Sequence, residues 1–370
     1  GKVIFNHVLQ RMGKIALVTG ACGFTGSNML EILHEKGWEI VATDLPQADR
    51  KVFYVEKGAF HPVYFSDIIK QTKAEFIPAD LTKRETLKSL FTRDYDAVFS
   101  IASLYDYFAP WELLYKVNVE GHKNLVEAWL ESGVKVRHWV HWSTDGVYGE
   151  TPYLPGDENA PYDPPNNYSR SKVEQERLLW KYYREKGLPL TVLRPAPIYG
   201  PRHTYGVYKT LLAPRKFGVG GVVRIYPRSK QLMYPCVHVR DLCEAAIYVA
   251  ERDDTIGEVF NVLSNCITQS EFSEFISHLA YCSPIYRIPV PFSLYKLASS
   301  FVIRVGRFLD NRARKKGKRP KFDVPELQYI THQYWFSNEK LKSIGYKFKF
   351  EDPREGLLDY YVWCKRQGKL

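Results

Sequence analysis

Long hydrophobic runs, paired cysteines and clustered histidines are all missing from this sequence. No apolar run reaches the roughly 18 residues of a transmembrane helix, so no membrane span is predicted. The six cysteines are scattered, with no CxxC pair, so we expect reduced thiols and no metal site. Residues 1–13 mix polar and apolar side chains and predict no signal peptide. We therefore expect a cytoplasmic protein that at most lies on a membrane surface.

Negative charge is in the minority, with 41 Asp plus Glu against 52 Lys plus Arg, for a formal net charge of +11. This excess favours an anionic partner such as a phosphorylated cofactor, a nucleic acid or a membrane surface. Apolar residues make up 45% and charged residues 25% of the 370-residue chain, which excludes a disordered chain and a disulfide-rich miniprotein. The length predicts about two domains, or one large α/β domain with a cap.

Predicted strands and helices alternate through the first half of the chain. Short apolar runs predict strands at 14–19, 38–43, 75–78, 97–101, 136–142 and 190–193. Helices are predicted over 27–36, 83–91, 113–131 and 168–185. Such alternation indicates a parallel sheet covered on both faces. The sequence thus predicts an α/β fold with a doubly wound parallel (Rossmann) sheet, mainly from 14–195. A smaller C-terminal substrate-binding cap is predicted mainly from 196–370, with some segments returning to the sheet.

Three glycines, Gly20, Gly23 and Gly26, lie between the first strand and the first helix. Gly20 permits a tight turn, Gly23 lets the backbone approach a pyrophosphate, and Gly26 allows the helix to pack closely on the strand. The helix N-terminus then offers free N–H groups to the phosphates. Asp44 closes the second strand, where a carboxylate accepts hydrogen bonds from the adenosine ribose and repels a 2′-phosphate. The predicted cofactor is therefore NAD.

Two alternatives stay open at this cofactor site. Arg50 and Lys51, which follow the second strand, keep NADP in play. Asp80 and Leu81 follow the third strand and are predicted to hold the adenine amino group, whereas an ordinary helix N-cap is the other interpretation of Asp80.

Several motifs, in the same order, resemble the extended short-chain dehydrogenase/reductase superfamily. They are the G-x-x-G-x-x-G spacing at 20–26, the asparagine motif at 118–121, the run at 143–149, Tyr168-x-x-x-Lys172, the signature at 193–201, and Val-His-Val-Arg-Asp at 237–241. The resemblance covers most of the chain and implies catalytic roles for Thr144, Tyr168 and Lys172. It also implies that the cofactor is bound by Gly20, Gly23, Phe24, Thr25, Gly26, Asp44, Asp80, Leu81, Ala102, Tyr168, Lys172 and Pro195.

The chemistry of this family explains why these residue types are needed. Tyr168 and Lys172 lie on one face of a helix, where the ammonium and the positive nicotinamide are expected to favour the phenolate. Tyr168 then exchanges a proton with the substrate oxygen while hydride passes to or from nicotinamide. Thr144, with Ser143 as the second candidate, polarises that oxygen. Asn118 is expected to support the site through a helix irregularity or a proton relay, the alternative being a solvent-facing helix residue.

The motifs for nucleotide-sugar substrates are incomplete in this chain. Pro197 stands where the epimerases carry an asparagine, Tyr234 where they carry a phosphate-binding arginine, and Gly146 where the dehydratases carry a glutamate. The residues that could replace the arginine are Arg202, Arg224 and Arg228. We therefore expect a sterol or other lipid substrate, as in the 3β-hydroxysteroid dehydrogenase branch. The alternatives are a nucleotide-sugar 4-epimerase or dehydratase and a non-catalytic NAD-binding regulatory protein.

The C-terminal third contains an apolar stripe that runs into a basic cluster. The stripe comprises Leu294, Leu297, Ala298, Phe301, Val302, Val305, Phe308 and Leu309, and seven of the ten residues at 312–321 are basic. This pattern suits the interface of an anionic membrane, and the alternative is a cap helix buried in the core followed by a solvated loop. The expected partners are a lipid or sterol, a membrane surface contacted through 291–321 and a second copy in a homodimer. No nucleic acid is expected, because no binding module accompanies the cluster.

Overall fold

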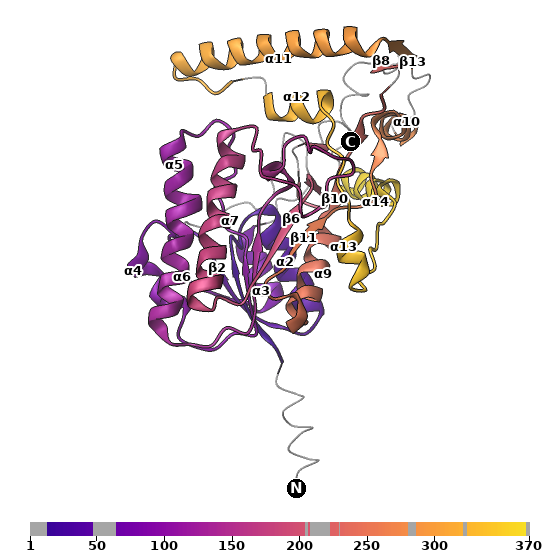
Figure 1. The fold of residues 1–370 in the computed structure, drawn as a ribbon. Coiled ribbons are helices and arrows are strands. Elements are labelled where there is room, and N and C mark those ends of the chain that lie inside the picture. The colour runs from indigo at the N-terminus through magenta and orange to yellow at the C-terminus, as the bar shows by residue number, and fades with distance from the viewer. Residues whose placement is uncertain are drawn as a thin grey trace.

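A seven-stranded parallel sheet forms the centre of the computed structural model, which describes residues 13–46, 64–203, 206–207, 223–228, 230–279, 286–320 and 324–367. Its strands are β1 (Ile15–Thr19), β2 (Glu39–Thr43), β3 (Glu75–Phe76), β4 (Ala97–Ser100), β5 (Trp139–Trp142), β6 (Leu190–Pro195) and β11 (Val259–Val262). The order is β11-β6-β5-β4-β1-β2-β3, and all neighbours are parallel. The order changes direction between β1 and β4, the place where such sheets bind ligands at their carboxyl ends. The predicted doubly wound fold is confirmed (Figure 1).

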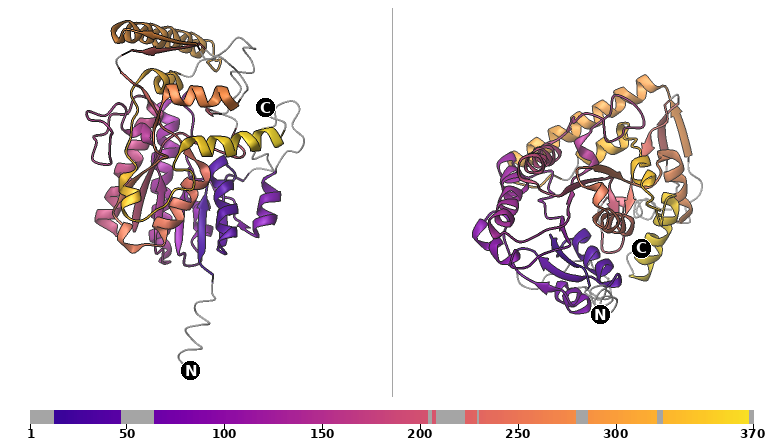
Figure 2. Two further views of the ribbon diagram at one scale, coloured as in Figure 1. Left: turned by 90° about the vertical axis from the view of Figure 1, so that its right-hand side faces the viewer. Right: turned by 60° about the horizontal axis from the view of Figure 1, so that its bottom comes forward.

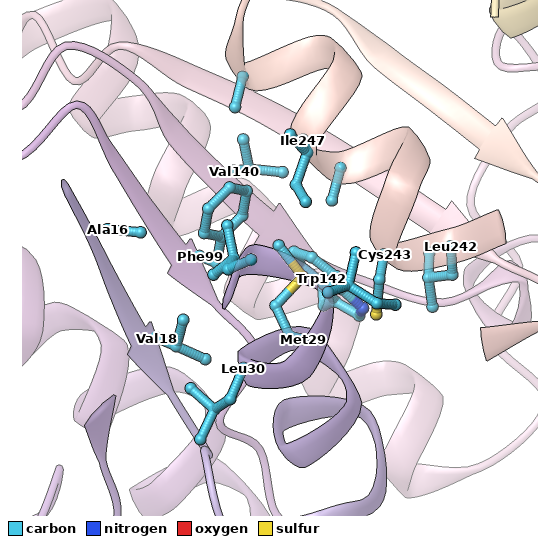
Figure 3. Close-up of a cluster of buried hydrophobic side chains, with 14 of the residues drawn as sticks. Ala16, Val18, Met29, Leu30, Phe99, Val140, Trp142, Leu242, Cys243 and Ile247 are labelled. Carbon is cyan, nitrogen blue, oxygen red and sulfur yellow. The ribbon is translucent and has the colours of Figure 1, made fainter. Parts of the chain in front are cut away.

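Helices cover both faces of this sheet, because successive side chains of each strand point to opposite sides. On one face lie α2 (Phe24–Glu35), α3 (Phe65–Thr72) and α9 (Val239–Ala250). On the other lie α4 (Arg84–Leu87), η1 (Lys88–Leu90), α5 (Trp111–Tyr115), η2 (Lys116–Glu120), α6 (Gly121–Ser132) and α7 (Asn167–Lys186). Ala16 and Val18 of β1 enter the first core, which Figure 3 shows, and Leu17 enters the second. The sheet is therefore apolar on both sides.

The cap lies beyond the carboxyl ends of the strands (Figure 1). Its helices are α10 (Gln269–Leu279), α11 (Phe292–Lys315), α12 (Val324–Thr331) and α14 (Pro353–Arg366), whereas α13 (Glu339–Ser343) packs against β11 and places Leu341 in the first core. Its short strands pair as β7 (Ile198–Tyr199) with β10 (Val237–His238), β9 (Met233–Tyr234) with β12 (Ile267–Thr268), and β8 (Val223–Pro227) with β13 (Tyr286–Val290). The remaining short helices are η3 (Asp145–Val147) and η5 (Asp253–Thr255). None of the helices in the described parts of the chain is long and apolar enough to cross a membrane.

The observed helices differ from the predicted ones at their ends and in one interior. The helix predicted over 113–131 is divided by η2, a π-turn, and the one predicted over 83–91 is a single α-turn followed by a 3₁₀-turn. α2 begins at Phe24, earlier than predicted, because its first turn already contains the third glycine of the loop. Helix ends are the part of a fold that periodicity predicts least well, since caps rather than apolar spacing determine them.

A buried ion pair fastens α7 to the sheet. Arg194 Nη2 of β6 lies 2.7 Å from Glu176 Oε1 of α7, and the side chains are 5% and 0% exposed. The guanidinium also donates to the hydroxyls of Tyr148, at 2.9 Å, and Tyr162, at 3.2 Å. Because two buried charges are stable only when paired and hydrogen-bonded, this network fixes the position of α7 relative to the strand ends.

Replacing Arg194 by methionine should therefore destabilise the fold strongly. Arg194→Met leaves the carboxylate of Glu176 buried without its partner, and we expect a loss of about 3–5 kcal/mol in the free energy of unfolding in urea. The matched control is Arg177→Met, which breaks the exposed Arg177–Glu174 pair on the same helix and should cost at most about 1 kcal/mol. Equal losses in the two variants would show that the buried pair does not hold α7.

Candidate active site

The glycine loop joins β1 to α2 in a turn that side chains would block. Gly20 has φ +65°, and a methyl group on Gly26 would lie 2.0 Å from the Gly20 carbonyl oxygen. Gly23 is the N-cap of α2, and in this described segment no side chain caps the helix and no acidic residue lies in its first turn. The first-turn N–H groups, which include those of Phe24 and Thr25, are therefore available to an anion, as NAD pyrophosphate requires.

The other predicted cofactor residues lie at the carboxyl ends of successive strands. Asp44 follows β2, and its carboxylate accepts hydrogen bonds from the backbone N–H groups of Cys22 and Leu45, both at 2.8 Å. The carboxylate is thus held against the glycine loop, where the adenosine ribose of NAD would be bound. Ala102, after β4, donates from its N–H to Thr19 Oγ1 at 3.1 Å. A Cβ on Gly20 would lie 2.9 Å from the Ala102 Cα, so this backbone passes directly over the turn.

Asp80 and Leu81 follow β3, and Pro195 ends β6. Asp80 Oδ1 accepts hydrogen bonds from the N–H and the hydroxyl of Thr82, so this carboxylate also caps the turn that follows it. The Leu81 carbonyl accepts a hydrogen bond from Asn124 at 2.8 Å. Arg50 and Lys51, on which the NADP alternative rested, lie outside the described residues.

Lys172 is buried between the ends of β4 and β5. Its Nζ donates to Ser103 Oγ at 2.9 Å and to the Trp142 carbonyl at 2.8 Å, and its side chain is 1% exposed. Burial lowers the pKa of Lys172 to about 7. Asn166 caps the start of α7 by accepting from the Ser169 N–H at 2.8 Å, which places the predicted tyrosine and lysine in the first turns of the helix.

Tyr168 is buried one turn before Lys172. Burial, and then the charge of nearby Asp145, raises the pKa of Tyr168 above its usual range. The predicted lowering of the phenol pKa is therefore not produced by the protein groups alone, because desolvation of the phenolate dominates. The positive nicotinamide of bound NAD would lower the pKa of this phenol.

Thr144 and Ser143 follow β5 and differ in their partners. Thr144 caps η3, with Oγ1 accepting from the Gly146 N–H at 3.1 Å. Ser143 donates its hydroxyl hydrogen to Glu176, inside the Arg194–Glu176 network. Ser143 is thus committed to the structural ion pair, which leaves Thr144 as the better candidate for contact with a substrate oxygen.

Asn118 sits in the π-turn η2 and is fully buried. Its Oδ1 accepts from the Leu104 N–H at 2.7 Å, and its Nδ2 donates to Ser171 Oγ at 3.0 Å. The predicted helix irregularity is present, and the solvent-facing alternative is wrong. Through these two hydrogen bonds Asn118 connects the loop after β4 to the turn of α7 that carries Tyr168 and Lys172.

Several aromatic residues of the site were not predicted. The rings of Tyr105 and Tyr107 contact Tyr168 edge-on, with centroids 5.0 and 5.4 Å away. Tyr329 of α12 donates its hydroxyl hydrogen to Asp145 Oδ1 at 2.7 Å. The dense aromatic run at 104–108 was a usable signal for the first two, but no local spacing connects Tyr329 to Asp145.

Asp145 is a buried carboxyl in the wall of a narrow cavity that Tyr107 and Ser169, two neighbours of Tyr168, also line. Its Oδ2 has no hydrogen-bond partner in the described parts of the chain, and burial raises the pKa of Asp145 to about 7 despite the bond from Tyr329. The cavity is lined by Tyr107, Asp145, Gly146, Tyr329, Tyr334 and Phe336, among others. Near neutral pH this carboxyl can therefore either donate or accept a hydrogen bond inside the cavity.

The sheet topology, the glycine loop and an acidic residue after β2 define a Rossmann-fold enzyme that uses a nicotinamide cofactor. The chain belongs to the NAD dependent epimerase/dehydratase family, whose profile matches residues 16–262. Its cofactor is NAD, and the expectation of an NAD-dependent enzyme of the extended short-chain dehydrogenase/reductase type is confirmed.

Curated relatives fall into sterol and sugar classes. The chain is 26% identical to 3beta-hydroxysteroid-dehydrogenase/decarboxylase isoform 1 of Arabidopsis thaliana, over 83% of this chain and 73% of that protein. It is 28% identical to the human sterol-4-alpha-carboxylate 3-dehydrogenase, decarboxylating, over 76% of this chain and 71% of that protein. It is 30% identical to the N-acetyl-alpha-D-glucosaminyl-diphospho-ditrans,octacis-undecaprenol 4-epimerase of Escherichia coli O157:H7, over 57% of each chain.

Solved structures show the same fold. The UDP-glucose 4-epimerase of Thermotoga maritima, solved with UDP-glucose, superposes with a TM-score of 0.68 at 21% identity, covering 95% of this chain and 99% of that one. The cap and the sheet therefore share the arrangement of this enzyme family.

Asp44 should determine the choice of cofactor. Asp44→Arg removes the ribose acceptor and supplies a guanidinium for a 2′-phosphate, so NADH affinity should fall at least about tenfold while NADPH affinity improves. Isothermal titration with both nucleotides measures the change. Unaltered NADH affinity in this variant would place the ribose elsewhere.

The raised pKa of Asp145 predicts a pH-dependent cost to stability. Between about pH 4 and 7 the folded chain keeps a proton that the unfolded chain has lost, so wild-type stability falls as pH rises and the cost levels off above pH 7. The stability of Asp145→Asn relative to wild type should therefore increase from pH 4 to 7 and then stay constant in urea unfolding. A constant difference across this range would mean that Asp145 is not buried as a neutral acid.

Proposed function

We propose that this protein is an NAD(H)-dependent oxidoreductase that interconverts a secondary alcohol and a ketone on a sterol or similar lipid. A narrow cavity carries the proposal; its lining includes Ser169, the chain neighbour of Tyr168, and Tyr107, whose ring contacts Tyr168. Aromatic rings of Tyr107, Tyr329, Tyr334 and Phe336 form its walls, and no lysine or arginine lines it among the residues that the structure describes. Aromatic walls suit an apolar ring system, whereas a nucleotide sugar brings two phosphates that require cations.

In this proposal the chain's own residues move one proton and hold one oxygen. Tyr168 takes the proton from the substrate hydroxyl, or returns it to the ketone, and Thr144 hydrogen-bonds the same oxygen. Bound NAD supplies the hydride acceptor. In this proposal Lys172 binds the nicotinamide ribose. Ser103 and the Trp142 carbonyl fix the position of its ammonium.

The positions that would hold a sugar nucleotide have other roles here. Tyr234 stacks on Phe272 with ring centroids 3.7 Å apart, inside an apolar cluster of the cap. Pro197 accepts a hydrogen bond from Val237 through its carbonyl and has no donor to offer. Arg202, one of the possible substitutes, is buried and pairs with Glu31 of α2 at 2.8 Å. The side chain of Arg224 lies outside the described residues.

The cavity is narrow, so a sterol-sized ligand requires α12 or the aromatic side chains to move apart. The sterol relatives named above, which match 83% and 76% of the chain, support this substrate class, whereas sugar relatives match up to 70% at similar identity. The undecaprenol epimerase keeps a nucleotide-sugar 4-epimerase as the second candidate, although the substrate in its name is itself lipid-linked. A homodimer remains a prediction.

Removing the Tyr168 hydroxyl should abolish the chemistry while sparing the cofactor. Tyr168→Phe removes the acid/base group, so turnover of the true substrate should fall by about a hundredfold or more with NADH affinity nearly unchanged. NAD reduction against a panel of 3-hydroxysterols and UDP- or GDP-sugars identifies that substrate. The control is Tyr153→Phe, an exposed tyrosine outside the site that should leave the rate unchanged.

Near wild-type turnover in Tyr168→Phe would refute the assignment of the acid/base. Activity confined to the nucleotide sugars would refute the lipid substrate and favour the epimerase.

A further inference from the structure

The outward face of α11 is apolar along most of its length. Leu297, Phe301 and Phe308 are 69%, 66% and 64% exposed. The large exposed apolar side chains of this helix are Leu294, Leu297, Phe301, Val302, Val305, Phe308 and Leu309. They recur at i, i+3, i+4 and i+7, so they form one continuous stripe. An apolar patch of this extent on a folded chain marks a binding surface.

The opposite face of α11 packs on the protein. Tyr295, Ile303 and Gly306 are its buried residues, and Gly306 faces Val324 and Leu327 of α12. Figures 1 and 2 show α11 on the outside of the cap, with α12 between it and the body of the molecule. The predicted stripe is therefore exposed, and the alternative of a cap helix buried in the core is wrong.

Charge on this helix favours an anionic occupant. Arg304 and Arg307 border the apolar stripe, and both are exposed. Further exposed cations follow at Arg312, Lys315, Lys316 and Lys318. None of these six forms an ion pair with another described residue. The only acidic residue of α11, Asp310, pairs with Arg314 on the inner side at 3.1 Å.

We propose that α11 docks along its length on an anionic lipid bilayer, with the apolar stripe among the acyl chains and the cations at the headgroups. An apolar face with cationic borders is the pattern of helices that lie in a membrane interface. An apolar protein partner would satisfy the stripe but leave the bordering cations unmatched. The proposal rests on the proposed function only for the identity of the lipid that enters the site.

Two residues of the predicted basic cluster contact another loop of the protein and are therefore left out of the proposed membrane contact. Arg314 donates to the carbonyl oxygens of Phe108, at 2.6 Å, and Tyr107, at 3.3 Å. Arg319 pairs with Asp106 at 3.0 Å. These contacts tie the end of α11 to the loop whose Tyr107 ring touches Tyr168. The neighbouring α12, on which α11 packs, supplies the Tyr329 wall of the cavity.

Sedimentation with vesicles tests the docking surface. Full-length protein is mixed with phosphatidylcholine vesicles, with and without phosphatidylserine, at low and high salt. We expect sedimentation with the phosphatidylserine vesicles that weakens as salt rises. The variant Arg304→Gln, Arg307→Gln, Lys315→Gln, Lys316→Gln, Lys318→Gln should bind on the order of a hundredfold more weakly.

A second variant separates the apolar contribution from the ionic one. Leu297→Ser, Phe301→Ser, Phe308→Ser should lose binding at every salt concentration. The matched control is Leu358→Ser, Val362→Ser, which changes exposed apolar residues of α14 and should bind as the wild type does. NADH affinity and thermal midpoint, measured for each variant, verify that it is folded.

Failure of the folded wild type to sediment at low salt would overturn the proposal. So would concentration-dependent self-association that the triple-serine variant abolishes, because the stripe would then be covered by a second copy. Turnover of detergent-dispersed sterol without vesicle binding refutes the docking surface alone. Vesicle binding without turnover of any sterol refutes the proposed function alone.

Discussion

An ammonium group buried between the ends of two strands is the constraint on which the site depends. The ammonium of Lys172 is buried, and two hydrogen bonds replace its water: one to Ser103 after β4 and one to the Trp142 carbonyl of β5. Lys172 can reach both acceptors only if β4 and β5 lie side by side and α7 is held at a fixed position along them. The Arg194–Glu176 pair, one turn further along α7, fixes that position. The sheet, the helix and the ion pair therefore position one lysine beside the expected cofactor.

The same burial gives the site a second ionisable group near neutrality. Lys172 and Asp145 both have pKa values of about 7, the first lowered and the second raised by desolvation. Burial, and then the charge of Asp145, raises the pKa of Tyr168, whereas a bound cationic nicotinamide would lower it. Tyr329 of the cap helix α12 donates a hydrogen bond to Asp145, which follows β5 of the sheet. This bond joins the cap to the sheet beside the candidate catalytic residues. Under the proposed mechanism, proton transfer by Tyr168 is therefore linked to cofactor binding and to the position of the cap.

Local spacing predicted the parts of the site that lie close together in the chain. The glycine loop, Asp44 and the Tyr168–Lys172 pair each follow from one strand end or one helical turn. The Asp145–Tyr329 contact was not predicted, because residues far apart in the chain leave no mark in a single sequence. The upward effect of burial on the pKa of Tyr168 was not predicted for a related reason, since burial depends on neighbours that periodicity does not reveal. The stripe on α11 was found, but its 3.6-residue period fits a buried and an exposed helix equally, and only packing against α12 decides between them.

The fate of the hydrogen on the reacting carbon tests the central claim most directly. A 3-hydroxysterol carrying deuterium at C3 is incubated with the enzyme and NAD, and both products are analysed by mass spectrometry. Net oxidation of a lipid alcohol predicts deuterium in the accumulated reduced cofactor and a 3-ketosterol without the label. No reduced cofactor and an intact labelled sterol, while a C4-deuterated nucleotide sugar is epimerised with retention of its label, would contradict the account.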